Sequence, residues 1–267
     1  MPNKSAIITG AANGLGRALS IALYNSGYGL ALIDIDEEGL TRLKDEIQRD
    51  GQTISVHTLD ISDESKVIKC RQAILAIHTR IDVLINNAGI SISQPFGEVE
   101  MEDFQRLFQV NFWGTVYCTK HFLPDLKKKA GSHIVNIISV FATMGFPGKS
   151  TYGASKSAVM GFTNSLRTEL IGTSVSLSLV IPPALDTGII ARGKHINEVM
   201  RQKEIEFLQQ NAMPVDRVAA IIVTKMHRNK YRIVIGRQTF WMDTAARLFP
   251  GLMTWLIAKR KKRIEFV

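Results

Sequence analysis

The amino-acid sequence predicts an α/β protein with a single domain, in which a doubly wound parallel sheet carries helices on both faces. Short apolar runs alternate along the chain with longer amphipathic segments, a pattern typical of parallel strands joined by crossover helices. A glycine-rich turn joins the first strand to the first helix. No linker interrupts the alternation, and 267 residues with 45% hydrophobic content suffice for one large core.

The composition argues against several classes of protein. Cys70 and Cys118 fall in predicted helices without ligand-like spacing, so we expect no disulfide, no metal site and a reducing, cytoplasmic location. The formal net charge is +9, but the basic excess lies after residue 224, where Asp243 and Glu265 are the only acids. This uneven distribution argues against a general nucleic-acid-binding surface. No signal peptide is recognisable, and no apolar run is long enough to span a bilayer.

The first predicted strand covers residues 5–9 and leads through a glycine turn into an amphipathic run over 17–25. This order is the context that a phosphate-binding loop requires. Gly10 permits a tight turn, Gly14 lets the backbone approach a pyrophosphate, and Gly16 lets the helix pack closely on the sheet. We expect the loop to bind a dinucleotide through Gly10, Asn13, Gly14, Leu15 and Gly16. The alternative is an ordinary glycine-rich turn.

The second strand, residues 29–33, ends in Asp34, eighteen residues after Gly16. A carboxylate at this interval binds the ribose 2′-hydroxyl of NAD and repels the 2′-phosphate of NADP. Neither Asn13 nor Ile35 supplies a cation for that phosphate, so NAD is favoured and NADP is the alternative. Asp34 could instead cap the next helix, but Asp36 is better placed for that role.

Further strands are predicted near residues 53–57 and 82–85, with a helix over 63–78 between them. Small and amide side chains after a buried strand suit a backbone lying against a cofactor. The residues expected to contact it here are Asp60, Ile61, Asn87, Ala88 and Gly89. A long helix is predicted over 101–127, with Asn111 near its middle. Asparagine is unfavourable inside a helix unless its side chain has a specific partner, and such a residue could bend the helix.

The proposed chemistry centres on Ser139, Tyr152 and Lys156. Ser139 follows a predicted strand over 133–138, at the sheet edge where such folds place their active sites. Tyr152 and Lys156 are one turn apart on a predicted helix. An ammonium ~4 Å from the phenol, at an effective dielectric of about 20, would favour the phenolate by ~4 kcal/mol. Tyr152 would then be a usable acid/base, and Ser139 could hydrogen-bond a substrate oxygen. The alternative is an exposed i,i+4 pair beside a strand-end serine.

Taken together, these motifs resemble those of the short-chain dehydrogenase/reductase family. The matching positions, in order, are Thr9, Gly10, Gly14, Gly16, Asn86, Asn87, Ala88, Gly89, Asn111, Ser139, Tyr152 and Lys156. The resemblance covers roughly residues 5 to 190. It implies a Rossmann-like single domain, NAD(P)-dependent interconversion of an alcohol and a carbonyl, and a homodimer or homotetramer.

The resemblance also implies a role for each catalytic residue. Tyr152 matches the general acid/base, and Ser139 matches the residue that orients the substrate oxygen. Lys156 matches the lysine that binds the nicotinamide ribose and lowers the tyrosine pKa, and Asn111 matches the support of a water-linked proton relay. Tyr152 and Lys156 therefore also count among the cofactor-binding residues.

One departure from the family pattern follows the predicted strand over 175–180, where Pro182-Pro183 replaces the usual Pro-Gly. The second proline has no backbone N–H and a fixed φ, so we expect a stiffer or displaced loop. Pro182 is retained among the expected cofactor contacts. Thr187 still matches the threonine that meets the nicotinamide carboxamide.

We place the catalytic domain at residues 1–237 and expect its segment 188–213, with a helix over 196–210, to form a lid over the substrate. An apolar pocket would accept a lipophilic alcohol or ketone, although the same side chains could be ordinary core packing. The substrate contacts expected are Ser139, Tyr152, Met144, Phe146 and Leu185. A helix over 214–227 and a last strand over 231–235 should complete the domain.

The remaining segment, residues 238–267, is apolar and then basic, ending in a run of Lys and Arg over 259–263. Such a segment suits contact with an anionic membrane surface. It could instead cover the substrate pocket, pack on a partner subunit or remain solvated. Two other functions stay open, a non-catalytic dinucleotide sensor or scaffold and a lipid-surface binding protein. A sensor would need the glycines and Asp34 but not the acid/base set, which favours an enzyme.

Overall fold

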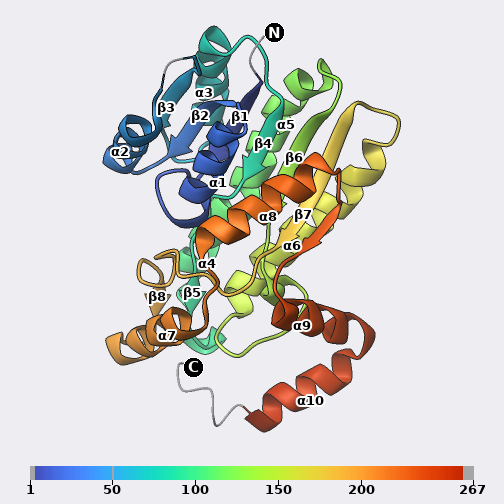
Figure 1. Ribbon diagram of the computed structural model, residues 1–267. Helices are drawn as coiled ribbons and strands as arrows, with labels where there is room; N and C mark the ends of the chain where they lie inside the picture. Colours follow the sequence, from blue (N-terminus) through green and yellow to red (C-terminus); the bar gives the residue numbers. More distant parts are fainter. Residues whose placement is uncertain (1–3, 50, 261–267) are drawn as a thin grey trace.

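The computed structural model describes residues 4–49 and 51–260. Seven parallel strands form one sheet in the order β3-β2-β1-β4-β6-β7-β9 (Figure 1), so the predicted doubly wound, Rossmann-like fold is confirmed. The strands are β1 (Ser5–Thr9), β2 (Gly29–Asp34), β3 (Ile54–Thr58), β4 (Val83–Asn86), β6 (Ser132–Ile137), β7 (Val175–Ile181) and β9 (Arg232–Val234). The strand order reverses at β1, which pairs with β2 on one side and with β4 on the other. Sheets of this kind bind dinucleotides at the point where the strand order reverses.

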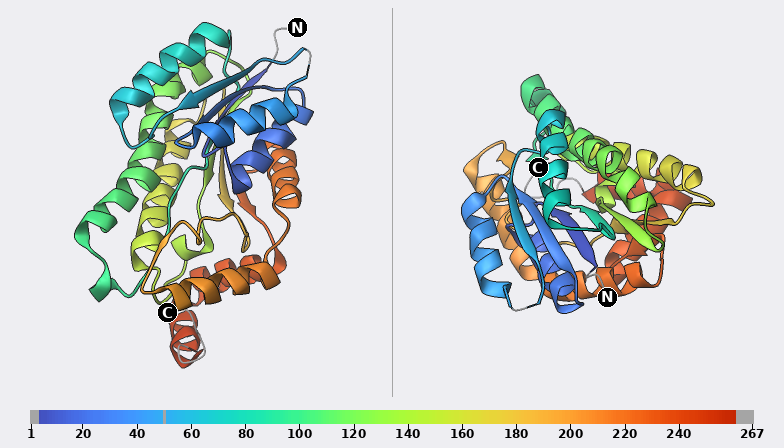
Figure 2. Two further views of the ribbon diagram at one scale, coloured as in Figure 1. Left: turned by 90° about the vertical axis from the view of Figure 1, so that its left-hand side faces the viewer. Right: turned by 90° about the horizontal axis from the view of Figure 1, so that it is seen from above.

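Helices cover both faces of the sheet (Figure 2). One layer contains α1 (Gly14–Asn25), α2 (Glu37–Ile47) and α8 (Val215–His227), and the other contains α3 (Glu64–Ile77), α5 (Gly114–Lys127) and α6 (Ser150–Glu169). Successive strand residues point to opposite faces. Ile8 therefore packs with the first layer, whereas its neighbour Ile7 packs with the second. Both residues are fully buried, which explains why the strand is apolar without alternation.

The helix predicted over 101–127 is interrupted. It consists of α4 (Met101–Phe108), a π-helical turn (Gln109–Trp113) and α5. Asn111 lies inside that turn, where its side chain bonds the backbone of Ile90 in a neighbouring loop. This contact explains the irregular turn, because π-bulges accompany side chains that bond outside their own helix.

Smaller elements lie beyond the carboxyl ends of the strands (Figure 1). They are β5 (Ile92–Ser93), β8 (Lys194–His195), α7 (Glu198–Asn211) and two 3₁₀ turns at Phe96–Glu98 and Val140–Ala142. The sequence predicted α7 but not the two-residue parallel pairing of β5 with β8. This pairing joins segment 188–213, which was predicted to form a lid, to the chain that follows β4.

The C-terminal segment forms α9 (Arg237–Leu248) and α10 (Pro250–Arg260), and α10 projects at the end of the molecule farthest from the amino terminus (Figure 2). Asp243 of α9 is buried and pairs with Arg232 of β9 at 2.5 Å, which attaches α9 to the sheet. Residues 261–263 of the predicted basic run lie outside the described residues. No described helix is both long enough and apolar enough to cross a bilayer.

Candidate active site

The glycine turn after β1 has no space for larger side chains. Gly10 and Gly14 have φ of +68° and +51°, in the left-handed region that favours glycine. A Cβ on Gly16 would lie 1.9 Å from the Gly10 carbonyl oxygen, and one on Gly14 would lie 2.6 Å from the Thr187 Cβ. The turn therefore presents bare backbone, and Thr187 from the segment after β7 lies against it.

The first amides of α1 have no side-chain cap. Asn13 occupies the N-cap position but donates its side-chain amide to Asp36 at 3.0 Å instead. Helix N-termini with unpaired amides attract anions. Together with the bare glycine turn, this geometry provides a cradle that fits a pyrophosphate.

The two aspartates after β2 have different partners. Asp36 caps α2 by accepting from the Gly39 amide at 2.9 Å, as predicted. Asp34 does not cap that helix. Its carboxylate accepts from the amides of Ala12, Ile35 and Asp36 at 2.9, 2.7 and 3.2 Å. These bonds hold Asp34 beside the glycine turn.

Asp60 and Ile61, after β3, anchor neighbouring helices. Asp60 accepts from Ser62 and pairs with Arg106 of α4 at 2.5 Å. Burial alone would raise the pKa of Asp60, but the hydrogen bonds from Ser62 and Arg106 leave it below its ordinary value. Ile61 is buried so close to Gly114 that a Cβ there would lie 2.5 Å from the Ile61 Cδ1.

Thr9 joins the glycine turn to the loop after β4. Its buried hydroxyl accepts from the amides of Asn87 and Ala88 at 3.0 and 3.1 Å and donates to the Ile85 carbonyl at 3.3 Å. The Asn87 side chain donates in return to the carbonyls of Thr9 and Gly10. The sequence contained Thr9 in its motif, but this role depends on the pairing of β1 with β4 and could not be deduced from it.

Asn111 connects the cofactor-side loop to α6. Its side-chain oxygen accepts from the Ile90 amide at 2.8 Å, and its amide group donates to the Ile90 carbonyl and to Ser155 Oγ, each at 3.0 Å. Ser155 in turn donates to the Tyr152 carbonyl at 2.8 Å. Asn111 is completely buried. The sequence gave no signal for Ser155, which links Asn111 to the backbone at Tyr152.

Ser139, Tyr152 and Lys156 converge at the carboxyl end of β6. The Ser139 hydroxyl accepts from the Phe141 amide at 3.2 Å and lies near enough to the Tyr152 phenol to act against the rise in its pKa. Lys156 is buried and donates to the Ile137 carbonyl at 3.1 Å. A Cβ on Gly89 would lie 3.4 Å from Lys156 Nζ and 3.0 Å from Asn111 Oδ1, so the loop after β4 passes directly beside both groups.

The expected effect of Lys156 on Tyr152 is not found in this structure. Although part of its side chain is exposed, burial raises the pKa of Tyr152 to about 12; the Ser139 hydroxyl opposes this rise and the Glu204 carboxylate adds to it. Burial also lowers the pKa of Lys156 to about 8. Desolvation thus outweighs the simple attraction that the i,i+4 spacing suggested.

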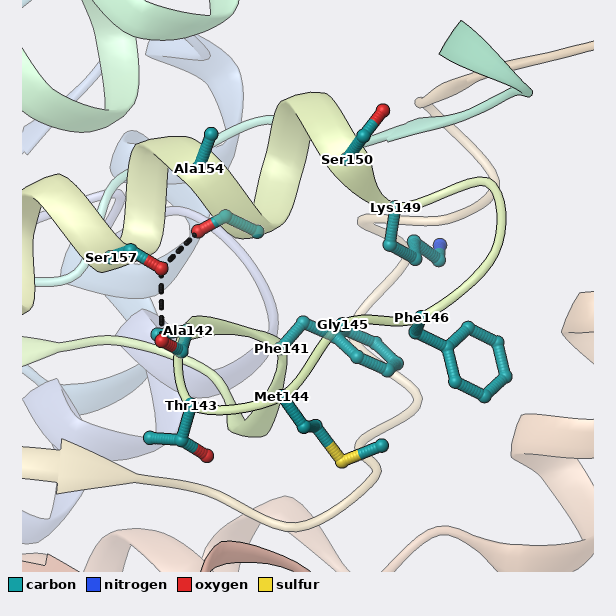
Figure 3. Close-up of a pocket in the computed structure, with 11 residues that line it drawn as sticks. Phe141, Ala142, Thr143, Met144, Gly145, Phe146, Lys149, Ser150, Ala154 and Ser157 are labelled. Atoms are coloured by element: carbon teal, nitrogen blue, oxygen red, sulfur yellow. Dashed lines mark hydrogen bonds between the residues drawn. The ribbon is translucent and has the colours of Figure 1, made fainter. Parts of the chain in front are cut away.

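A cavity of about 360 Å³ adjoins these residues (Figure 3). It is lined by Phe141, Ala142, Thr143, Met144, Gly145, Phe146, Lys149, Ser150, Gly153, Ala154 and Ser157. Met144 and Phe146, which were predicted to contact the substrate, line this cavity. None of Ser139, Tyr152 and Lys156 lines it, so the cavity lies beside these three residues and does not contain them.

Leu185 does not belong to this cavity. It packs against the core cluster on the α1 and α8 side of the sheet. The segment that carries it, after Pro182 and Pro183, has no regular secondary structure. The Met213 amide donates to the Ala184 carbonyl at 3.1 Å, which ties this segment to the end of the lid.

The thiols are unsuited to chemistry in this structure. Cys70 and Cys118 are free and buried, and burial raises the pKa of each to about 12. Across residues 4–49 and 51–260, no group of three His, Cys, Asp or Glu side chains is placed to hold a metal ion.

Comparisons with known proteins agree with this geometry. The family model for short chain dehydrogenases matches residues 4–197. The uncharacterized oxidoreductase YusZ of Bacillus subtilis is 34% identical over 279 residues, which cover 98% of this chain and 99% of YusZ. The 1-deoxy-11-beta-hydroxypentalenate dehydrogenase of Streptomyces exfoliatus is 32% identical over 193 residues, 71% of this chain and 70% of that protein.

A short chain dehydrogenase/reductase from Burkholderia phymatum, solved in complex with NAD, superimposes with a TM-score of 0.86 at 25% identity, covering 95% of each chain. The chain therefore belongs to the short-chain dehydrogenase/reductase family of oxidoreductases.

Proposed function

We propose that the protein is an NAD-dependent dehydrogenase or reductase that interconverts an alcohol and a carbonyl. The observation that carries this proposal is the convergence of Ser139, Tyr152, Lys156 and Asn111 beside the glycine turn. Ser139 lies near enough to Tyr152 to influence its pKa, and Asn111 reaches the Tyr152 backbone through Ser155. A protein that only senses a dinucleotide would not need this hydrogen-bonded set.

The cofactor proposal is supported by the residues present. The cradle formed by Gly10, Gly14, Gly16 and the uncapped start of α1 fits a pyrophosphate. Asp34 lies beside it with a negative charge that disfavours a 2′-phosphate, so we propose NAD and keep NADP as the alternative. The Burkholderia phymatum relative contains NAD. A bound nicotinamide would accept or supply the hydride.

The residues of this chain would handle the proton. Tyr152, with a pKa raised to about 12, is protonated at neutral pH and can donate to a carbonyl oxygen during reduction. Ser139 would bind that same oxygen and stabilise its developing charge. In the oxidation direction a positive nicotinamide ring near the phenol would favour the phenolate, and Tyr152 would then act as the base. Lys156 would hold the ribose.

We propose a lipophilic substrate. Phe141, Met144 and Phe146 come from one loop, and their side chains line the cavity beside Tyr152 (Figure 3). Ser157 fixes this loop by donating to the carbonyls of Ala142 and Gly153 at 2.9 and 2.8 Å. An apolar wall of this kind favours substrates with hydrocarbon chains.

A panel of alcohols and ketones of graded chain length, assayed with NADH and NADPH in parallel, tests these proposals. We expect kcat/KM to rise with chain length and to be higher with the NAD pair. The Tyr152→Phe variant serves as the inactive control. Equal rates for short and long substrates would contradict the lipophilic pocket, and faster turnover with NADPH would contradict the cofactor.

We further propose that the C-terminal helices contact a membrane surface peripherally. The exposed apolar side chains on α9, on α10 and at the residue between them include Phe240, Trp241, Leu248, Phe249, Leu252 and Trp255. A second cavity of about 70 Å³ lies between α10 and the loop that carries Met144. Aromatic side chains near a basic chain end suit an anionic bilayer, and a lipophilic substrate could be drawn from it.

Co-sedimentation with anionic liposomes at two salt concentrations tests this surface. The double variant Leu252→Ser with Trp255→Ser should lose binding, while Ile171→Ser, which changes an exposed apolar residue elsewhere, should not. Unchanged binding by the double variant would contradict the proposal.

We also propose that the protein is a cytoplasmic homodimer or homotetramer, and light scattering would measure its oligomeric state. A monomer would contradict that part, and loss of oligomers in the double variant would assign the helices to a subunit interface.

A further inference from the structure

Three ionisable side chains outside the catalytic set meet below the lid. Lys149 Nζ lies 2.6 Å from Glu204 Oε1, and His195 Nε2 lies 3.1 Å from Glu204 Oε2. Their side chains are only 2%, 3% and 7% exposed for Lys149, His195 and Glu204. They come from the residue before α6, from β8 and from α7, so the group joins three separate elements. We call it the Glu204 cluster.

The polar atoms of the cluster have further partners. Lys149 also donates to Ser93 Oγ of β5, and His195 Nδ1 faces the Gly193 carbonyl at 3.2 Å. Gln94 donates to the His195 carbonyl at 3.1 Å. Buried charges are costly, and a buried ion pair contributes little net stability even when it is well paired. Such a cluster instead determines how α7, β8 and the start of α6 pack together, because separating them would leave a buried charge without its partner.

The lid helix α7 depends on this cluster to an unusual degree. Glu204 is the only buried residue of α7. Of its apolar residues, Val199 and Phe207 are exposed and Met200, Ile205 and Leu208 are half-buried, so the helix places no fully buried apolar side chain into the core. Hydrophobic packing usually holds a lid, whereas here the buried contact is ionic.

The cluster also lies next to the catalytic tyrosine. Lys149 precedes Tyr152 by one turn, and its carbonyl accepts from the Gly153 amide at 2.7 Å. Lys149 lines the cavity, and its ammonium lies 5.9 Å from the centre of the Phe141 ring. The Glu204 carboxylate adds to the raised pKa of Tyr152. Burial lowers the pKa of Lys149, and the Glu204 charge opposes that effect.

We propose that Lys149, Glu204 and His195 are positioning residues that hold the lid helix over the substrate site and balance charge beside Tyr152. This inference rests on the proposed function, because it assigns these residues to the same reaction. Lys149 neutralises the Glu204 carboxylate, and His195 holds its second oxygen. The charged and titratable groups around the Tyr152 hydroxyl are then Glu204 with its partners Lys149 and His195, the Ser139 hydroxyl, and Lys156 from the same helix.

The test compares Glu204→Gln and Lys149→Met with Glu206→Gln, a control at an exposed site on the same helix. Both cluster variants should raise the substrate KM by about tenfold or more. Without the ion pair the lid helix is no longer held closed, so part of the binding free energy of the substrate is used to close it. NADH binding, measured by fluorescence, should change by less than about twofold in both, because the glycine turn is untouched. The control should match the wild type.

The pH profile of the oxidation rate separates positioning from general loosening. Glu204→Gln removes a negative charge from beside Tyr152, so the profile should move to lower pH. Lys149→Met leaves that charge unbalanced, so the profile should move to higher pH. In the double variant the two shifts should largely cancel while KM stays raised. Unshifted profiles, shifts in one common direction or an unchanged KM would overturn the proposal.

Hydrogen exchange gives a readout that does not need activity. The α7 amides should exchange faster in Glu204→Gln than in Glu206→Gln, and equal exchange would overturn the latch. If Lys149→Met does not fold, Ser93→Ala removes one hydrogen bond from Lys149 without changing charge, and it should also accelerate exchange in α7. A wild type that transfers no hydride would refute the proposed function, whereas the exchange result would still decide whether the cluster holds the lid.

Discussion

Thr9 offers a sharp test of how the two cofactor-side loops are held together. Thr9→Val keeps the shape of the side chain and suits a strand, but it removes the hydroxyl that accepts from the Asn87 and Ala88 amides. Thr9 is fully buried, so water cannot replace that acceptor. The amides of Asn87 and Ala88, both in half-buried residues, would lose this acceptor; at about 1–3 kcal/mol each, the free energy of unfolding should fall by about 2–6 kcal/mol.

Urea unfolding followed by circular dichroism measures this loss, and a fluorescence titration measures NADH affinity. We expect weaker NADH binding as well, because Ala88 lies against Gly10 in the same arrangement. Thr41→Val is the matched control, since Thr41 is exposed on α2 and donates only to the Glu37 carbonyl. It should change stability by less than about 0.5 kcal/mol. A Thr9→Val protein as stable as the control, with unchanged NADH affinity, would refute the reasoning.

Three further outcomes are expected. Gly16→Ala should abolish NADH binding in the fluorescence titration, because the added Cβ would lie 1.9 Å from the Gly10 carbonyl oxygen; retained affinity would contradict the cradle. Asp34→Asn should narrow the preference for NADH over NADPH, measured as a ratio of kcat/KM values, by on the order of 2 kcal/mol, or about 30-fold. An unchanged ratio would show that Asp34 does not face the ribose. Burial lowers the pKa of Lys156 from 10.5 to about 8. The unfolded chain therefore binds this proton more tightly than the folded protein does. Below pH 8 the folded protein must bury the charged ammonium, and the full cost of that burial lowers its stability. The free energy of unfolding should therefore rise between about pH 8 and about pH 10.5, and urea unfolding should show a smaller rise in Lys156→Met.

The features predicted correctly from the sequence are those that depend on neighbouring residues. The main strands were recognisable because each is a short apolar run, and the Asp36 cap because it precedes Glu37 and Glu38. The glycine turn was identified for the same reason, because the strand, the spaced glycines and the helix follow one another directly along the chain.

The features that were missed or wrong depend on contacts between distant segments. Asn111 was expected to bend the helix over 101–127, but its partner, the Ile90 backbone, could not be identified from the sequence. The pairing of β5 with β8 joins residues about a hundred positions apart. The spacing of Tyr152 and Lys156 predicted an attraction, but burial of both groups outweighs it in the structure. The Glu204 cluster could not be anticipated, because Lys149 and Glu204 are separated by 55 positions.

Under the proposed function, Tyr152 transfers the proton while the rest of the site binds the dinucleotide. Single-turnover hydride transfer and NADH binding, measured side by side for the wild type and Tyr152→Phe, test it most directly. We expect the rate to fall by about 10²–10⁴-fold while the NADH dissociation constant stays within about twofold. A variant that transfers hydride at the wild-type rate would contradict the claim.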